Sequence, residues 1–310
     1  MDKIVNRKPP PVQQGRVSWR FSRFILPRLS VLNAVSGWLT VWDSFGTPGD
    51  TLSTATICRE IRRRYPRVKL NCITPNPGLL ELDPAIDRLN GPAGLAVLRF
   101  WYLDLIKQKD GVTNLLAPTL GQVGIRDFEY RARFYLSDGE RAAGKRRLAG
   151  LAKPVITLNV QSREKVKMWF DSRWAEVVAA LSSDYDIVQL GTDEEPHFPG
   201  VTRLAGQLSM RESAAVLAQA KLHLGGVSFL MHVANGLDVQ AVIVYGGRET
   251  PANSGYRDNI NLYAKTACSP CWLHDSHGDV CPYDMECMKR ITSAEVVAAS
   301  REILAGKRRA

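Results

Sequence analysis

The hydrophobic pattern of the chain alternates between short apolar runs and longer segments of helical periodicity. Runs of strand length lie at residues 38–42, 68–73, 154–159, 186–190, 222–224 and 241–245. Helical periodicity is found at about residues 51–65, 171–181, 214–220 and 293–305. Residues 95–107 fit a strand or a helix equally well. This alternation predicts an α/β fold with parallel sheets.

Several helix boundaries are marked by residues that favour helix ends. The expected helix at residues 51–65 stops before Pro66 and carries one apolar face. That face is made of Leu52, Ala55, Cys58 and Ile61. Ser209 and Glu212 match the Ser-x-x-Glu capping box, so a helix is expected to begin just after Ser209.

The most informative segment runs from Ala220 to Gly247. A short strand stops at Gly225-Gly226, a helix-compatible stretch with His232 follows, and a second strand ends at Gly246-Gly247. This order places a helix N-terminus just past the carboxyl end of a strand, where free amides and the helix dipole bind anions. Many doubly wound folds share the pattern, so it indicates an anion site rather than one activity.

Length and composition predict two domains. A chain of 310 residues with 45% apolar content can bury a large core. The polar stretch at about residues 136–150 marks the boundary between a domain at 38–150 and a domain at 151–310, with an N-terminal arm at 1–37. Strands and helices alternate in both halves, which predicts two Rossmann-like domains facing one another across a cleft.

The net charge of +10 is concentrated at the two ends of the chain. Residues 1–30 contain seven Lys and Arg against one Asp, and residues 289–310 contain six against two Glu. The body is therefore neutral, which argues against a nucleic-acid partner. The Arg and aromatic residues of 16–38 suit an arm at the inner membrane surface. They equally suit aromatics packed on their own domain with arginines in solvent.

Targeting signals are absent from the sequence pattern. No run of eighteen apolar residues occurs, and the start, MDKIVNRKPPPVQQG, lacks the apolar core of a signal peptide. We therefore expect a cytoplasmic protein, with peripheral contact to the inner membrane if the arm binds it.

The six cysteines form two groups. Cys58 and Cys72 fall in expected core elements, where we predict buried, unreactive thiols. The other four lie in a loop-rich segment at residues 268–287, namely Cys268, Cys271, Cys281 and Cys287. Four thiolates in twenty residues suit a structural zinc or iron ion, and a cytoplasmic location disfavours disulfides. His274 and His277 lie inside this loop as alternative ligands.

The order of the motifs resembles glycosyltransferase family 9, the heptosyltransferases of lipopolysaccharide assembly. The matching features are Gly49-Asp50-Thr51-Leu52 after the first strand, Lys167-x-Trp169 in the second half, the glycine turn before Met231-His232, and the late cysteines. The resemblance covers roughly residues 38–300 and implies the GT-B fold. It also implies an inverting, metal-independent transferase that needs no cofactor for catalysis. Its donor is a nucleotide diphosphate sugar, usually ADP-heptose, and its acceptor is a hydroxyl of a lipopolysaccharide or other cell-envelope glycan.

The resemblance assigns Asp50 as the catalytic base. An inverting transfer needs a group that takes the proton of the attacking hydroxyl, and a carboxylate can do this. The alternative is that Asp50 merely caps the helix at residues 51–65, for which Asp is well suited.

The resemblance also implies a set of donor-binding residues. They are Ser162, Lys167, Glu194 or Glu195, Gly226, Ser228, Phe229 and His232. Lys167 and the amides of Ser228 and Phe229 would face the diphosphate, and one glutamate would accept from the ribose hydroxyls. The alternatives are an ordinary basic loop around Lys167, a surface loop at the glutamates and a structural histidine at 232.

One departure from the family pattern keeps other functions open. Val227-Ser228-Phe229 stands where many members have Asp, Ser or Thr, and Gly, so the donor sugar need not be a heptose. A catalytically inactive GT-B binding or scaffold protein is the main alternative, and a nucleotide-sugar hydrolase or epimerase is another.

Some family members that glycosylate autotransporter proteins carry a four-cysteine iron site, which supports a metal here. Arg248, Glu249 and Tyr256 are either cleft residues or parts of a surface loop.

Overall fold

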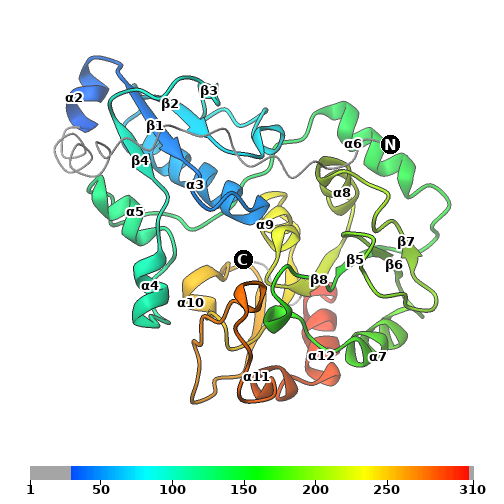
Figure 1. Ribbon diagram of the computed structural model, residues 1–310. Coiled ribbons are helices and arrows are strands. Elements are labelled where there is room, and N and C mark those ends of the chain that lie inside the picture. Colours follow the sequence, from blue (N-terminus) through cyan, green and yellow to red (C-terminus); the bar gives the residue numbers. More distant parts are fainter. Residues whose placement is uncertain (1–28, 307–310) are drawn as a thin grey trace. The chain divides into compact units, whose positions relative to one another are not determined.

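The computed structural model describes residues 29–306 (Figure 1). The expected basic arm at 1–37 lies largely outside these residues. Its described part includes the short helix α2 (Leu29–Ala34). In the described part of the chain, no helix has the length and apolar character needed to cross a membrane.

The described chain divides into two compact units. Unit 1 comprises the chain up to Trp101 together with Pro118–Phe128, and unit 2 comprises Tyr102–Ala117 together with the chain from Glu129 onward. The expected boundary near residue 150 therefore falls inside unit 2. The reason is a tertiary contact: α6 (Asp138–Arg147) packs on α8 (Met210–Leu217), and Arg211 forms a 2.6 Å ion pair with Glu140.

Unit 1 is built on a four-stranded parallel sheet in the order β3-β2-β1-β4. Its strands are β1 (Trp38–Trp42), β2 (Lys69–Ile73), β3 (Arg88–Leu89) and β4 (Val97–Arg99). Its other elements are α2, α3 (Pro48–Arg64), the 3-10 turn η2 (Pro77–Leu79) and most of α5 (Ala117–Gln122). The apolar face expected for the first long helix is confirmed in α3, where all four side chains are buried.

Unit 2 is built on a six-stranded parallel sheet in the order β10-β9-β8-β5-β6-β7. Its strands are β5 (Val155–Asn159), β6 (Asp186–Gln189), β7 (Thr202–Arg203), β8 (Leu222–Gly226), β9 (Ala241–Tyr245) and β10 (Ile260–Tyr263). Its longer helices are α6, α7 (Asp171–Leu181), α8, α9 (Phe229–Gly236) and α12 (Ser293–Leu304). Its short elements are α4 (Leu103–Gln108), η3 (Lys165–Lys167), α10 (Pro251–Ser254), η4 (Asp275–His277) and α11 (Glu286–Lys289).

The expected strands and helices are confirmed with small shifts at their ends. The helix expected at 51–65 begins three residues earlier, because Pro48 occupies its first turn and Thr47 caps it. Residues 95–107, which fitted a strand or a helix, contain both β4 and α4. The capping box of Ser209 and Glu212 is present at the start of α8.

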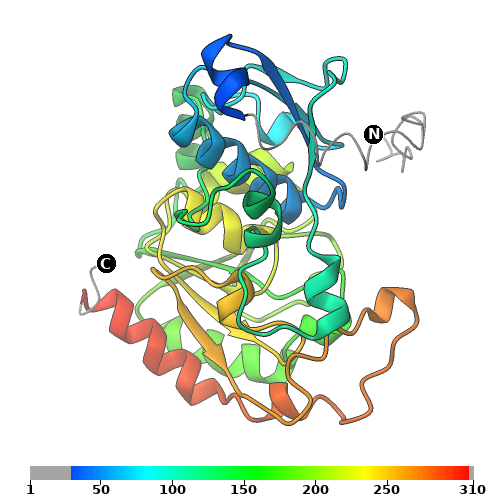
Figure 2. The same cartoon turned by 90° about the vertical axis from the view of Figure 1, so that its left-hand side faces the viewer.

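The core of unit 2 is formed between its sheet and the pair α7 and α12 (Figure 1 and Figure 2). Trp174 and Val177 of α7 and Val296 of α12 are fully buried against Leu158 and Val242 of the sheet. Burying such side chains stabilises each by roughly 1.5–3 kcal/mol. This packing supports the carboxyl ends of β5, β8 and β9, where the predicted donor residues lie.

Candidate active site

Asp50 lies in the first turn of α3 in unit 1. Its backbone N–H donates to Thr47 Oγ1 over 3.3 Å, and the Thr47 hydroxyl donates to Asp50 Oδ2 over 2.6 Å. Thr47 is therefore the N-cap, and the alternative in which Asp50 caps the helix is wrong. A carboxylate in the first turn is stabilised by the helix dipole. The half-buried side chain of Asp50 is held by its neighbour rather than used as a cap.

Asp43, at the end of β1, fixes the loop that leads to Asp50. Its buried Oδ2 accepts from Thr51 over 2.6 Å and from Thr74 over 2.8 Å, while Oδ1 accepts from the Gly46 N–H over 2.9 Å. Burial raises the pKa of Asp43, and these hydrogen bonds oppose the rise. One carboxylate thus ties together the ends of β1 and β2, the loop and the start of α3.

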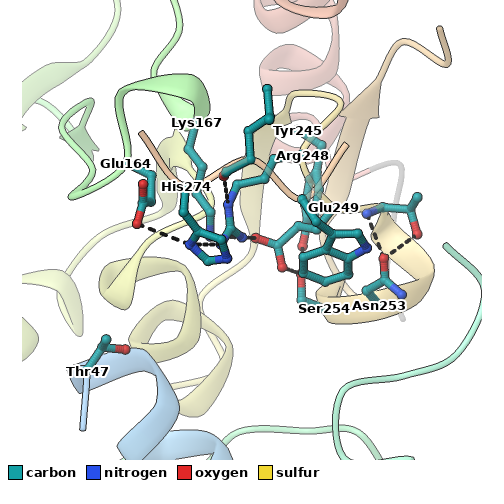
Figure 3. Close-up of polar contacts among 12 residues, drawn as sticks. Thr47, Glu164, Lys167, Tyr245, Arg248, Glu249, Asn253, Ser254 and His274 are labelled. Carbon is teal, nitrogen blue, oxygen red and sulfur yellow. Dashed lines mark hydrogen bonds and ion pairs between the residues drawn. The ribbon is translucent and has the colours of Figure 1, made fainter. Parts of the chain in front are cut away.

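Lys167 is anchored by Glu249, a buried glutamate in the loop that follows β9. Its Nζ lies 2.5 Å from Glu249 Oε1, and Arg248 approaches the same oxygen to 3.2 Å. Ser254 Oγ donates to Glu249 Oε2 over 3.0 Å. Burial alone would raise the pKa of Glu249, but Lys167 and Arg248 outweigh it and lower the pKa to about 2. Figure 3 shows these side chains converging after β9.

The neighbouring cations of the same loop are placed differently. Arg163 and Lys165 are exposed, whereas only 18% of the Lys167 side chain is accessible. Ser162 is half-buried. The burial of Lys167 therefore distinguishes it from Arg163 and Lys165, which the sequence alone could not do.

His232 is held inside unit 2 by an aromatic contact. Its Nδ1 is 2.7 Å from the hydroxyl of Tyr256, whose ring stacks on Tyr130 with centroids 4.8 Å apart. Burial lowers the pKa of His232 to about 4, so the ring is neutral at pH 7. The charge of Glu249 raises the pKa of His232 and that of Lys167 lowers it, but both effects are smaller than that of burial.

The glycine turn is required by close approach of the backbone. A side chain on Gly225 would place Cβ 2.6 Å from the Asn159 carbonyl oxygen, and one on Gly226 would meet the Lys167 carbonyl oxygen at 3.3 Å. Ser228 begins α9 but does not cap it with its side chain; its Oγ donates to Asn159 Oδ1 over 2.8 Å. The first amides of α9 have no partners within the helix, as at any helix start.

Val227 and Phe229 flank Ser228 at the start of α9. Val227 is buried and Phe229 is half-buried. An acid that does lie beside Lys167 is Glu249, which comes from the loop after β9. A carboxylate is thus present beside the lysine although the glycine turn lacks one.

The two candidate glutamates of the acidic loop differ sharply. Glu194 is exposed. Glu195 is buried, and its oxygens accept from the backbone N–H groups of Val160 and Gln161, each over 3.0 Å, and from the Asn159 side chain. Burial raises the pKa of Glu195 and the hydrogen bonds oppose this. Glu195 therefore fixes the loop after β5.

Arg248 links the loop that carries Lys167 to the cysteine loop, which we define as residues 268–287. Its Nε donates to the Leu273 carbonyl oxygen over 2.8 Å, and its Nη2 lies 2.9 Å from His274 Nδ1. His274 is in turn 3.4 Å from Glu164. The guanidinium also lies 5.5 Å from the centroid of Trp272.

The four late cysteines lie together in unit 2. Cys268, Cys271, Cys281 and Cys287 line one cavity of about 410 Å³. All four are free thiols. Burial raises the pKa of Cys271 and of Cys287, while the amides of Leu273 and Gly247 donate to their sulfur atoms. Figure 2 shows the cysteine loop (orange) extending from the unit.

This donor set fits a zinc or iron ion in its chemistry. Four thiols share one cavity, and backbone amides that donate to sulfur stabilise the thiolate form. In the described part of the chain, however, no three His, Cys, Asp or Glu side chains have the arrangement that one ion requires. The types of side chain in this cavity therefore support the expected metal site, whereas the arrangement of these side chains does not.

The expectation of buried thiols at Cys58 and Cys72 is confirmed. The hydrogen bond between the Cys72 thiol and Cys58, followed by burial, raises the pKa of Cys72 well above its usual value. These thiols belong to the core of unit 1.

Two residues of the site escaped the sequence analysis. Asp43 and Asn159 are polar residues at the ends of buried strands, and each connects its strand to the loop that carries a predicted site residue. A polar residue that ends an apolar run is the signal that would have identified both.

The chain matches the sequence profile of glycosyltransferase family 9 (heptosyltransferase) over residues 109–277. No curated protein matches it in sequence.

Solved structures share the fold. The crystal structure of the glycosyl transferase family 9 from Veillonella parvula is 15% identical, with a TM-score of 0.67 over 87% of this chain and 97% of that chain. The iron-containing dodecameric glycosyltransferase TibC from enterotoxigenic E. coli is 21% identical, with a TM-score of 0.70 over 87% and 77%. ADP-heptose lps heptosyltransferase II of E. coli is 14% identical, with a TM-score of 0.59 over 87% and 99%. TibC has also been crystallised in complex with ADP-D-beta-D-heptose. These structures have the GT-B fold, and the two parallel α/β sheets found here match it.

Proposed function

The chain belongs to glycosyltransferase family 9, and on that premise we propose that it transfers a heptose or related sugar from an ADP-linked donor. The acceptor is a hydroxyl group of a lipopolysaccharide or other cell-envelope glycan. The observation that supports a diphosphate donor is the anchored Lys167 beside the start of α9; the ADP moiety is proposed from the similarity to TibC, which was crystallised with ADP-D-beta-D-heptose. Ammonium and helix amides together suit a diphosphate.

In the proposed reaction the acceptor hydroxyl attacks the anomeric carbon and the configuration inverts. Asp50 takes the hydroxyl proton as the new C–O bond forms and the bond to the diphosphate breaks. The hydrogen bond from Thr47 occupies Oδ2 and orients the carboxylate. Asp43 supports the same role because it holds the loop that carries Thr47.

The leaving nucleoside diphosphate gains negative charge as the bond breaks. Lys167 and the amides of Ser228 and Phe229 stabilise this charge more strongly in the transition state than in the ground state. His232, neutral at pH 7, contributes as a hydrogen-bond donor and not as a cation. Gly226 keeps the turn free of side-chain atoms.

For the ribose hydroxyls we assign Glu194, whose exposed carboxylate is able to accept from two vicinal hydroxyls. Glu195 is already occupied by protein donors and instead positions the loop with Ser162. Ser162 is placed to donate to a phosphate oxygen.

The donor is tested by melting the full chain with ADP, UDP, GDP, dTDP and CMP. A nucleotide at a hundredfold its dissociation constant adds about 2.7 kcal/mol of stability. A shift with ADP supports the donor assignment, and a shift with another nucleotide replaces it. No shift with any nucleotide would instead favour the binding or scaffold protein, for which Val227 is the supporting observation.

The base is tested with Asp50→Asn. The variant should lose transfer by a factor of about 10² or more, yet keep the ADP-induced melting shift of the wild type. Full activity in this variant would show that Asp50 only stabilises the turn. Lys167→Met is the complementary variant and should weaken the ADP shift.

We also propose that Cys268, Cys271, Cys281 and Cys287 hold a structural zinc or iron ion. Such an ion would cross-link the cysteine loop, and it takes no part in the transfer. TibC is described as iron-containing, which makes iron the first ion to test. Contact of the basic ends with the inner membrane, and a cytoplasmic location, stay predictions.

A further inference from the structure

Tyr256 lies in the loop between α10 and β10 and is held there from several sides. The residue is 2% exposed, and its ring stacks on Tyr130 with centroids 4.8 Å apart and an interplanar angle of 10°. Its carbonyl oxygen accepts from the Asn259 N–H over 3.2 Å and from the side-chain amide of Asn261 over 3.1 Å. The position of the phenol is therefore fixed by the protein, before any ligand is bound.

The hydroxyl group of this fixed ring meets the imidazole of His232. The hydroxyl oxygen lies 2.7 Å from Nδ1, and the two rings are nearly perpendicular, at 89°, with centroids 5.6 Å apart. A phenol O–H is a stronger acid than the N–H of a neutral imidazole, and an unprotonated imidazole nitrogen is a stronger base than a phenol oxygen. The Tyr256 hydroxyl therefore donates to Nδ1.

This hydrogen bond decides which nitrogen of His232 carries the proton. Burial lowers the pKa of the ring to about 4, so at pH 7 the imidazole is neutral and has a single N–H. Because Nδ1 accepts from Tyr256, the proton is on Nε2. In the part of the chain that the structure describes, the hydrogen bond found for His232 uses Nδ1, which leaves the Nε2–H to donate to a ligand.

We propose that Tyr256 is a positioning residue of the donor site: it holds His232 in the Nε2–H tautomer, so that Nε2 donates to the diphosphate. This rests on the proposed function, in which His232 contacts the diphosphate. The opposite tautomer would turn the Nε2 lone pair toward the phosphate oxygens and repel them. Because Tyr256 is buried, it acts through the imidazole and not on the ligand directly.

Tyr256→Phe tests this role because it removes the hydroxyl and keeps the ring that stacks on Tyr130. In the full-length protein labelled with 15N-histidine and free of ligand, long-range proton–nitrogen spectra should show wild-type His232 protonated at Nε2. The variant should show a mixture of both tautomers. Tyr245→Phe is the matched control, since it also removes a buried hydroxyl, one that lies 3.2 Å from Ser254 Oγ. It should leave the tautomer of His232 unchanged.

Binding of ADP shows whether this tautomer matters for the donor site. Tyr256→Phe should weaken ADP binding about tenfold by calorimetry, because a hydrogen bond to a charged group is lost. His232→Gln, which also assigns the His232 signal in the spectra, carries an amide N–H whose presence does not depend on Tyr256. In that background Tyr256→Phe should have no further effect on ADP binding.

Three outcomes would overturn the proposal. They are a wild-type His232 protonated at Nδ1, an unchanged tautomer in Tyr256→Phe, and an effect of Tyr256→Phe on ADP binding that is absent or is equally large in the His232→Gln background. A wild type without any ADP melting shift would overturn the proposed function, and with it the role of Tyr256 at the diphosphate. The tautomer is measured without ADP, so the two failures are distinguishable.

Discussion

A carboxylate with almost no solvent exposure is stable at position 249 because two cations face it. Lys167 and Arg248 both approach Oε1, and Ser254 donates to Oε2. A buried charge without such partners would be strongly unfavourable. At this scale the structure explains how a chain with Val227 in the glycine turn still keeps an acid beside its lysine.

Replacement of Glu249 by Gln should destabilise the protein by about 3 kcal/mol, since it leaves the Lys167 ammonium facing a neutral amide. Chemical denaturation of the wild type, Glu249→Gln, Lys167→Met and the double variant measures the coupling. We expect the double variant to lose less stability than the sum of the two single variants. Strictly additive losses would show that the two side chains do not interact.

Among elements, α6 shows how a polar segment becomes part of a domain. Residues 136–150 are polar and charged, which is why the sequence predicts a domain boundary there. In the structure Ser137 and Glu140 form a capping box, and Gly144 faces the backbone of α8. The helix is held by close backbone packing and an ion pair rather than by apolar burial.

Gly144→Ala should therefore be destabilising. A Cβ at this position would lie 2.1 Å from the Ala215 carbonyl oxygen, so α6 must move away from α8. Forcing atoms into packed structure costs about 1–3 kcal/mol. Gly139→Ala in the same helix is the control, because its nearest neighbour is Ser137 Oγ at 3.9 Å. We expect that variant to be neutral or more stable, by up to about 1 kcal/mol. Thermal unfolding measures the melting temperatures of both variants. Equal melting temperatures would show that Gly144 is not required by the close packing of α6 on α8.

The cysteine loop provides a second prediction for an element. Elemental analysis of protein purified without chelators should find about one zinc or iron per chain. The variant Cys271→Ser with Cys281→Ser should lose the metal and melt at a lower temperature. Cys58→Ser is the control for loss of a thiol elsewhere, and it should keep the metal. Metal-free wild-type protein with an unchanged melting temperature would contradict the proposal.

For the whole molecule, two buried histidines predict how stability depends on pH. Burial lowers the pKa of His223 to about 3 and that of His232 to about 4, whereas both have ordinary values near 6.5 when unfolded. Below pH 6.5 the unfolded chain therefore binds more protons, and stability falls as pH decreases toward 4.

The loss should be about 1.4 kcal/mol per pH unit for each histidine. Denaturation of the wild type between pH 7.5 and 5 measures this slope, and His223→Gln should halve it. An unchanged slope in that variant would mean that His223 is solvated. The stability that Glu249 contributes is lost at lower pH, between its ordinary pKa near 4.5 and about 2.

Local patterns in the amino-acid sequence were enough to predict the elements and the family. Strand runs, helix caps and the glycine turn are local, so they predicted β1, α7, α8 and β9 within a few residues, and the ordered motifs identified a family 9 glycosyltransferase. Which residues contact one another, in contrast, became known from the folded chain. Lys167 differs from Arg163 and Lys165 by its contact with Glu249, eighty-two positions later, and the unit boundary depends on the packing of α6. Such contacts join residues far apart in the chain, and no local pattern records them.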